Sequence, residues 1–395
     1  MEIKYSKIAN SLKASEIREI LKLSEMPQII SFAGGMPASE TFPIKELAKI
    51  SKKVIEEDGN IALQYTATEG YTPLRETIAK ERMTKLGVKT SAEEILIISG
   101  SQQGLDLIGR LLIDENDTVI CENPSYLGAL NAFRLNNPNL IGIPMDKDGM
   151  IIEELEKVLA TDTTVKLIYT IPDFQNPTGV TMSLERRKRL AELATKYKVI
   201  VAEDSPYGEL NFNKRTLPSI KSFDRDGYVI FIGTFSKILC PGNRIAWMCA
   251  KKEILEKLTQ MKQAVDLQSS TLSQRIIYFY INKYDIEAHI ENINTLYLKR
   301  RDVMINAIES FFPKDVGITR PSGGLFIWVE LKQEIDTAEL LKKALTLNVA
   351  FVPGKAFFVD ADKRNFLRLN YSSMNELKIE EGIKRISKLL TKYYN

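Results

Sequence analysis

Residues 229–237 read Val-Ile-Phe-Ile-Gly-Thr-Phe-Ser-Lys, an apolar run that ends in two hydroxyls and an amine. Val and Ile favour strands, and apolar residues on both faces of a strand indicate a sheet that is covered on both sides. Six similar runs occupy the middle of the chain: Ile95–Ser99, Thr118–Cys121, Leu140–Ile143, Leu167–Ile171, Val199–Ala202 and Ile245–Ala250. We therefore expect a mostly parallel seven-stranded sheet.

Helical patterns separate most of these runs, among them Ser101–Leu112, Glu153–Leu159 and Leu184–Tyr197. Strands that alternate with helices predict an α/β fold in which helices sandwich the sheet. The third pattern contains the basic run Arg186–Arg189. Since leucines give the same helix an apolar side, we interpret this run as a solvated face and not as a nucleic-acid patch.

The last hundred residues have a different pattern. Asn294–Ser310 reads as a long charged helix, Gly324–Leu331 as an alternating strand and Ile379–Leu390 as an amphipathic helix. This order predicts a smaller α+β domain. We expect residues 44–293 to form the large domain, and residues 1–43 and 294–395 to form the small one.

Composition narrows the functional classes. The 395 residues contain 54 Lys plus Arg and 51 Asp plus Glu, and a net charge of +3 does not favour nucleic acid or an anionic membrane as a partner. Three cysteines are an odd number and indicate no disulfide framework, so we expect a cytoplasmic protein.

His289 is the single histidine, which argues against a histidine-based triad or a multi-histidine metal site, and we expect no metal. We interpret His289 as a helix-surface residue.

Polar clusters follow four of the predicted strands directly: Gly100–Gly104, Pro172–Gly179, Glu203–Tyr207 and Gly233–Lys237. Ligands of parallel α/β sheets bind beyond the carboxyl ends of the strands, where loops and helix N-termini converge. Each cluster alone is a weak signal. Together they predict one site at one edge of the sheet.

The densest cluster has the donors that a phosphate needs, in Thr234, Ser236 and Arg244. Lys237 stands among apolar neighbours, and a desolvated, cation-rich site favours the free amine that Schiff-base chemistry requires. The alternative is an exposed loop lysine. Asp204 ends an apolar strand, so it is either a buried carboxylate with a cationic partner or a helix N-cap.

Two other segments are ambiguous by themselves. The glycine turn Gly100–Gly104 could hold an anion at a helix N-terminus or be a tight turn without a ligand. It matches neither a Walker loop nor the full dinucleotide fingerprint. Asn176, in Asn-Pro-Thr-Gly, could equally be a turn residue.

With these residues the chain resembles the class I/II aminotransferases, pyridoxal-phosphate enzymes of fold type I. It is most similar to the group of 2-aminoadipate aminotransferase and kynurenine aminotransferase II. Thr-Phe-Ser-Lys…Pro-Gly-Asn-Arg at 234–244 and Asn-Pro-Thr-Gly at 176–179 carry the resemblance, which extends from residue 17 to residue 369. Thr234, Asn243 and Ser322 depart from the usual residues of the family, which are Ser, an apolar residue and Glu.

The resemblance implies pyridoxal 5'-phosphate as cofactor and assigns roles around its ring. Lys237 would form an aldimine with it and move the proton of the substrate α-carbon. Asp204 would pair with the pyridine nitrogen. Asn176 and Tyr207 would bond the ring oxygen, and Tyr126 would stack on the ring. The resemblance makes Lys237, Asp204 and Tyr207 the catalytic residues.

It also implies a shared site in a homodimer, because a tyrosine from a second subunit reaches the phosphate. The expected phosphate ligands are Ser101, Gln102, Thr234, Ser236, Arg244 and the second subunit's Tyr65. Arg368 would clamp the substrate α-carboxylate, with Gly35 and Asn176 beside it. Arg18 would bind the distal carboxylate of acidic substrates, although a surface arginine fits the same helical pattern.

The implied activity is transfer of an amino group from an L-amino acid to a 2-oxo acid such as 2-oxoglutarate, by a ping-pong mechanism. The expected donors are 2-aminoadipate and glutamate, and also aromatic or branched-chain amino acids. One alternative is another enzyme with this cofactor, such as a β-lyase. A regulator with a helix-turn-helix domain is disfavoured because residues 1–30 are too few for that domain, and a dehydrogenase because the glycine fingerprint is incomplete.

Overall fold

The structure of the protein is a computed structural model, which describes residues 3–6, 8–9, 26, 28–359 and 363–394. Arg18, the expected ligand of a distal carboxylate, lies outside the described residues. Within them, no helix is long and apolar enough to cross a membrane.

The large sheet contains all seven predicted strands in the order β2-β9-β8-β7-β6-β3-β4, and the short strand β5 adds an eighth at one edge. The five strands from β8 to β4 are parallel, whereas β9 runs antiparallel to both of its neighbours and β5 antiparallel to β4. The strands are β2 Ile95–Ile98, β3 Thr118–Asn123, β4 Asn139–Asp146, β5 Gly149–Met150, β6 Val165–Thr170, β7 Ile200–Ser205, β8 Val229–Thr234 and β9 Ala246–Cys249.

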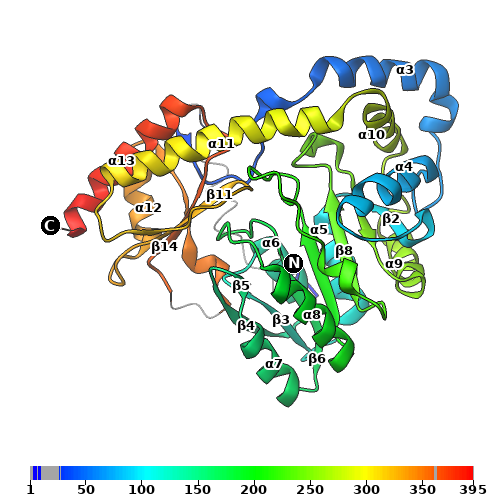
Figure 1. Cartoon of the computed structure of the whole chain (residues 1–395), viewed down its shortest axis with the longest axis horizontal. Coiled ribbons are helices and arrows are strands. Elements are labelled where there is room, and N and C mark those ends of the chain that lie inside the picture. The colour runs from blue at the N-terminus through cyan, green and yellow to red at the C-terminus, as the bar shows by residue number, and fades with distance from the viewer. Residues whose placement is uncertain (1–2, 7, 10–25, 27, 360–362, 395) are drawn as a thin grey trace.

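Helices cover both faces of this sheet, as Figure 1 shows. Successive residues of one strand enter different cores: Val119 and Cys121 join one apolar cluster and Ile120 joins the other. The first cluster includes α5 (Ser101–Leu112) and α9 (Lys252–Val265), and the second includes α7 (Ile152–Thr161) and α8 (Leu184–Tyr197). The α/β sandwich is thereby confirmed.

Further helices complete this part of the chain. They are α3 (Ile44–Ala62), α4 (Thr72–Thr77), a π-helical turn (Ile78–Met83), α6 (Leu127–Arg134) and α10 (Thr271–Lys283). Helix α3 packs along α10 (Figure 1).

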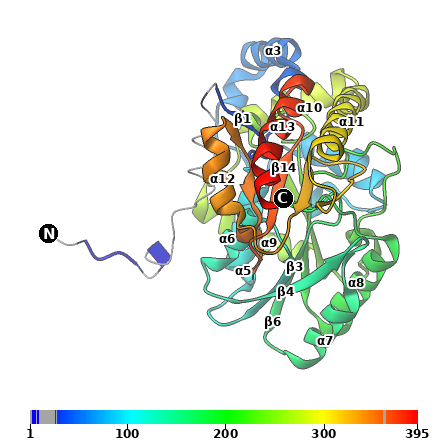
Figure 2. The ribbon, with the colours of Figure 1, turned by 90° about the vertical axis from the view of Figure 1, so that its left-hand side faces the viewer.

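A smaller α+β unit is built on an antiparallel sheet in the order β10-β11-β14-β13. Its helices α11 (Ile286–Phe311), α12 (Thr337–Thr346) and α13 (Glu376–Tyr394) lie beside one another in Figure 2. The strands are β10 Gly317–Ile318, β11 Phe326–Glu330, β13 Val352–Pro353 and β14 Phe366–Asn370, and β1 (Ile30–Ser31) pairs in parallel with β12 (Val349–Ala350). Helix α11 runs unbroken through residue 293, and the domain limits stay a prediction.

Two surface expectations need correction. Arg187 is fully buried, and its guanidinium is 2.6 Å from the Asp173 carboxylate. The basic run on α8 is therefore not wholly a solvated face, since one of its arginines anchors the loop that follows β6. His289 is half-buried and contacts the Tyr280 ring, and burial lowers its pKa.

Candidate active site

A cavity of about 530 Å³ lies at the carboxyl ends of the central strands, and residues of the smaller unit also line it. Of the residues predicted for the site, all but two line it: Gly35, Ser101, Gln102, Tyr126, Asn176, Asp204, Tyr207, Thr234, Ser236, Lys237, Arg244 and Arg368. Tyr65 does not line it and is 77% exposed, and Arg18 is not described. The four polar clusters thus meet at one edge of the sheet.

Lys237 follows β8 and reaches into this cavity. Its Nζ donates a hydrogen bond to the Gly35 carbonyl, with a donor–acceptor distance of 2.9 Å. Burial, reinforced by the cations Arg244 and Arg368 and opposed by the charge of Asp204, lowers the pKa of Lys237 to about 8. About a tenth of the lysine is then free amine at pH 7, far more than at its ordinary pKa.

Asp204 lies at the end of β7 and is 2% exposed. Its Oδ2 accepts a hydrogen bond from the Tyr169 hydroxyl at 3.0 Å, while Oδ1 has no partner among the described residues. Burial outweighs the Tyr169 hydrogen bond and the Lys237 charge, which lower the pKa of Asp204, and raises it to about 7. A buried carboxylate oxygen without a partner fits a cationic ring N–H.

An anion cradle surrounds the start of α5. Gly100 has φ 86°, and a Cβ there would lie 2.1 Å from Arg244 Nη2, so only glycine admits the guanidinium this close. Ser101 Oγ is buried without a hydrogen-bond partner in the described part of the chain. The hydroxyls of Thr234 and Ser236 are 2.9 Å apart. The helix N-terminus, hydroxyls and guanidinium suit a phosphate.

Arg368 comes from β14 of the smaller unit and is buried against two aromatic rings, at 4.2 Å from Phe326 and 5.1 Å from Phe357. Its Nη1 donates to Asn176 Oδ1 at 2.8 Å and its Nη2 to the Ala33 carbonyl at 2.6 Å. Burial lowers the pKa of Arg368 to about 10, which keeps the guanidinium charged at neutral pH. It can therefore receive a carboxylate in two parallel hydrogen bonds.

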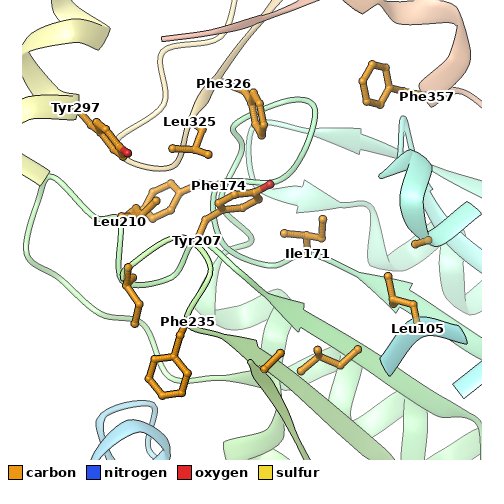
Figure 3. Close-up of a cluster of buried hydrophobic side chains, with 14 of the residues drawn as sticks. Leu105, Ile171, Phe174, Tyr207, Leu210, Phe235, Tyr297, Leu325, Phe326 and Phe357 are labelled. Carbon is orange, nitrogen blue, oxygen red and sulfur yellow. The ribbon is translucent and has the colours of Figure 1, made fainter. Parts of the chain in front are cut away.

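Aromatic side chains frame the remaining walls. The Asn176 amide bonds the Tyr207 hydroxyl, and the Tyr207 ring meets Phe326 edge-on at 5.8 Å. Figure 3 shows Tyr207 between Phe326 above and Ile171 to one side. Tyr126 lies over Gly128, where a Cβ would be 2.5 Å from its ring. Burial raises the pKa of both tyrosines, so their hydroxyls stay protonated.

Sequence reasoning missed several residues of the site. Tyr169 was counted only as part of an apolar strand, although it pairs in register with Ala202 and bonds Asp204 two residues further on. Ala33 and Phe357 come from segments far away in sequence, and no local pattern marks them. Asn243, the departure beside Arg244, has a buried amide nitrogen without a hydrogen-bond partner among the described residues.

These groups define a site for a phosphorylated aromatic cofactor held beside a lysine amine. The partnerless carboxylate oxygen of Asp204, the partnerless hydroxyl of Ser101 and the glycine at residue 100 each fit one part of pyridoxal phosphate. The class of protein defined by this site on this fold is a fold-type I enzyme of that cofactor.

The chain belongs to the family "Aminotransferase class I and II", which it matches over residues 27–386. It is 46% identical to aromatic-amino-acid aminotransferase 1 of Thermococcus litoralis over 98% of this chain and 94% of the relative. It is 41% identical to the 2-aminoadipate transaminase of Thermus thermophilus over 98% and 96%. A kynurenine aminotransferase of Pyrococcus horikoshii, solved in complex with PMP, superposes with a TM-score of 0.95 at 44% identity over 99% of this chain and 98% of that one. The protein is thus a pyridoxal-phosphate-dependent aminotransferase.

Proposed function

We propose that the chain transfers the amino group of 2-aminoadipate, glutamate, aromatic or branched-chain L-amino acids to a 2-oxo acid such as 2-oxoglutarate. The proposal rests above all on one juxtaposition: the Lys237 amine shares a cavity with the buried guanidinium of Arg368. An α-amino acid needs both groups, one near its Cα–H bond and one for its carboxylate. The names of the aromatic and 2-aminoadipate relatives support both donor classes.

When bound, pyridoxal phosphate supplies an aldehyde for amines and a ring that withdraws electrons. Ser101, Gln102, Thr234, Ser236 and Arg244 would hold its phosphate. Asp204 would hold a proton at the ring nitrogen, and Tyr126 would support the ring face. Asn176 and Tyr207 would bond the ring oxygen.

Arg368 would fix the substrate carboxylate, with Gly35 and Asn176 beside it, and so orient the Cα–H bond toward Lys237. Lys237 would take the proton from the α-carbon, because its lowered pKa leaves part of it as free amine. In a ping-pong sequence the first 2-oxo acid leaves before the second enters. The same residues of the cavity would therefore serve both half-reactions.

A panel of amino donors with 2-oxoglutarate tests this function. We expect glutamate to form with 2-aminoadipate and with an aromatic donor, in parallel double-reciprocal plots. Borohydride should fix the cofactor at Lys237. Pyruvate and ammonia released from a β-substituted alanine, without glutamate, would instead identify a β-lyase.

Arg18 extends the proposal to acidic donors, as ligand of their distal carboxylate. Arg18→Ala should then raise KM for 2-aminoadipate about tenfold or more while leaving KM for leucine nearly unchanged. Equal losses for both donors would make Arg18 a structural residue.

We further propose a cytoplasmic homodimer in which Tyr65 completes the partner's site. The 77% exposure of Tyr65 and its absence from the cavity of its own chain support this. Lys237→Ala protein mixed with Tyr65→Ala protein, assayed at a pyridoxal phosphate concentration too low to fill a site without Tyr65, should restore up to about one quarter of the activity, because one site of each mixed dimer then carries neither change. No recovery after subunit exchange contradicts the shared site.

A further inference from the structure

Glu122, in β3, is a buried carboxylate that the proposed reaction does not use. It is 1% exposed and is not among the residues that line the cavity. Three donors converge on it: Thr170 Oγ1 at 2.6 Å, the Ile171 backbone N–H at 3.2 Å and Gln175 Nε2 at 3.0 Å. Burying a carboxylate is costly, so such a group in a core needs a function or a strong structural role.

Gln175 is the partner that links this carboxylate to the site. Its Nε2 also donates to the Pro124 carbonyl at 2.9 Å. Its Oε1 accepts from the N–H and the hydroxyl of Thr178, at 3.0 and 2.8 Å. Gln175 is fully buried, and its whole amide is therefore committed to joining the loop after β3 to the loop after β6.

Both loops present residues to the cavity. Pro124 precedes Tyr126 by two residues, and Gln175 is followed by Asn176, which contacts both Arg368 and Tyr207. We propose that Glu122 and Gln175 are positioning residues: this buried pair fixes the two loops, and so sets the placement of Tyr126 and Asn176 and, through Asn176, of Arg368. The proposal rests on the proposed function of that cavity. It adds the hydrogen bonds that hold the two loops of the cavity wall in place.

Hydrogen-bonding geometry makes a conservative variant available. In Glu122→Gln the amide oxygen can still accept from Ile171 and Gln175, while the amide nitrogen can donate to the Thr170 hydroxyl once that hydroxyl turns. Glu122→Leu instead removes the acceptor of three buried hydrogen bonds, and Gln175 Nε2 keeps only its bond to the Pro124 carbonyl. The two variants therefore separate loss of the hydrogen bonds from loss of the charge.

Glu203 offers a matched control: it directly precedes Asp204 in β7, but it does not itself line the cavity. It is also fully buried and also accepts three hydrogen bonds, from the Ser219 hydroxyl at 2.6 Å and from the N–H groups of Ile220 and Lys221, both at 2.9 Å. These donors belong to the segment around Ile220–Phe223, which does not line the cavity. Glu203→Leu should match the folding defect of Glu122→Leu without moving the loops of the site.

The test compares these variants as holoenzymes in three measurements: KM for the amino donor, the dissociation constant of added pyridoxal phosphate, and the pH midpoint of the visible absorbance of the bound cofactor. For Glu122→Leu we expect about tenfold rises in KM and in the dissociation constant, and a midpoint shift of about half a pH unit or more. Glu122→Gln should stay within about twofold of the unchanged protein. Equal changes in Glu122→Leu and Glu203→Leu would overturn the proposal.

Gln175→Met decides the matter if the leucine variants do not fold, because it leaves Glu122 and its other two donors in place. It should raise KM and shift the absorbance midpoint in the same directions, and an unaltered Gln175→Met enzyme would overturn the proposal. Failure of the function itself would look different, since the unchanged protein would then bind no cofactor at Lys237.

Discussion

Lys262 and the partly buried Lys237 are two described lysines whose pKa burial lowers, and they differ in the groups around them. Lys262, in α9, is fully buried and lies 2.7 Å from one Asp266 oxygen and 2.9 Å from the other, with Gln103 Oε1 at 3.1 Å. Among the residues that the structure describes, Lys237 donates to one carbonyl, that of Gly35, and has two arginines in its surroundings. Burial lowers the pKa of both lysines, but Asp266 opposes it at Lys262, whereas Arg244 and Arg368 reinforce it at Lys237.

The difference shows how one residue type serves two purposes. A buried ammonium in contact with a carboxylate is a structural ion pair whose removal weakens the fold. A buried amine among cations and without a contacting carboxylate has a lowered pKa and loses its proton readily. Its charged form destabilises the fold. The charged groups around each lysine, and not burial alone, distinguish the reactive lysine from the structural one.

The largest expected effect is on the chemistry. Lys237→Ala should lower kcat/KM by about 10⁴-fold, since a proton-transfer group is lost at the reacting carbon. Lys262→Ala, assayed with saturating pyridoxal phosphate, should stay within about tenfold of the unchanged enzyme. Steady-state assays of both variants check this contrast, which fails if the two losses are alike.

Apoprotein stability should change in opposite directions for the two lysines. The folded pKa of Lys237, about 8, lies below its ordinary value of 10.5. The contribution of Lys237 to the stability of the apoprotein is therefore fully present above pH 10.5 and is lost as the pH falls through 8. At pH 7 Lys237→Met should therefore stabilise the cofactor-free protein, by up to about 3 kcal/mol. Lys262→Met should destabilise it by about 2 kcal/mol: burial also lowers the pKa of Lys262, but removing this lysine leaves the Asp266 carboxylate, whose pKa the ion pair lowers, without its cation.

Urea unfolding of the apoproteins at pH 7 and pH 10.5 measures both effects. The gain in Lys237→Met should shrink at the higher pH, where the lysine of the unchanged protein is neutral in the folded state. A loss of stability in Lys237→Met at pH 7 would show that its amine is already satisfied by the fold.

Several features behind the contrast between Lys237 and Lys262 could be predicted from the sequence. Strand runs that end in polar clusters predicted the parallel sheet and the meeting of Lys237, Asp204 and Arg244 at one edge, because the carboxyl ends of parallel strands must coincide. The spacing of Lys262 and Asp266 is also visible as an i,i+4 pair on a helix. The order of residues and predicted elements along the chain was enough to predict these features.

Other features depend on contacts that local order does not encode. Arg187 stands in a run of four basic residues, yet only tertiary packing turns it inward to Asp173. Glu122 looks like an ordinary charged residue at a strand end, and its three donors become apparent only when β3 and β6 are placed side by side. The short edge strand β5 was missed because Gly149–Met150 is too short for a periodic signal.

The finest effect concerns the protonation of Lys237 itself. Two neighbours act on its pKa with opposite signs, since the Arg368 charge lowers it and the Asp204 charge raises it. In the apoprotein, Arg368→Met should therefore raise the midpoint above 8 and Asp204→Asn should lower it, each by about one pH unit or less. Competitive labelling with acetic anhydride across pH 6–11, read by mass spectrometry of the Lys237 peptide, measures the midpoint directly. Shifts of the same sign in both variants would mean that rearranged packing, and not charge, controls the amine, and neighbouring charges would then not be what distinguishes Lys237 from Lys262.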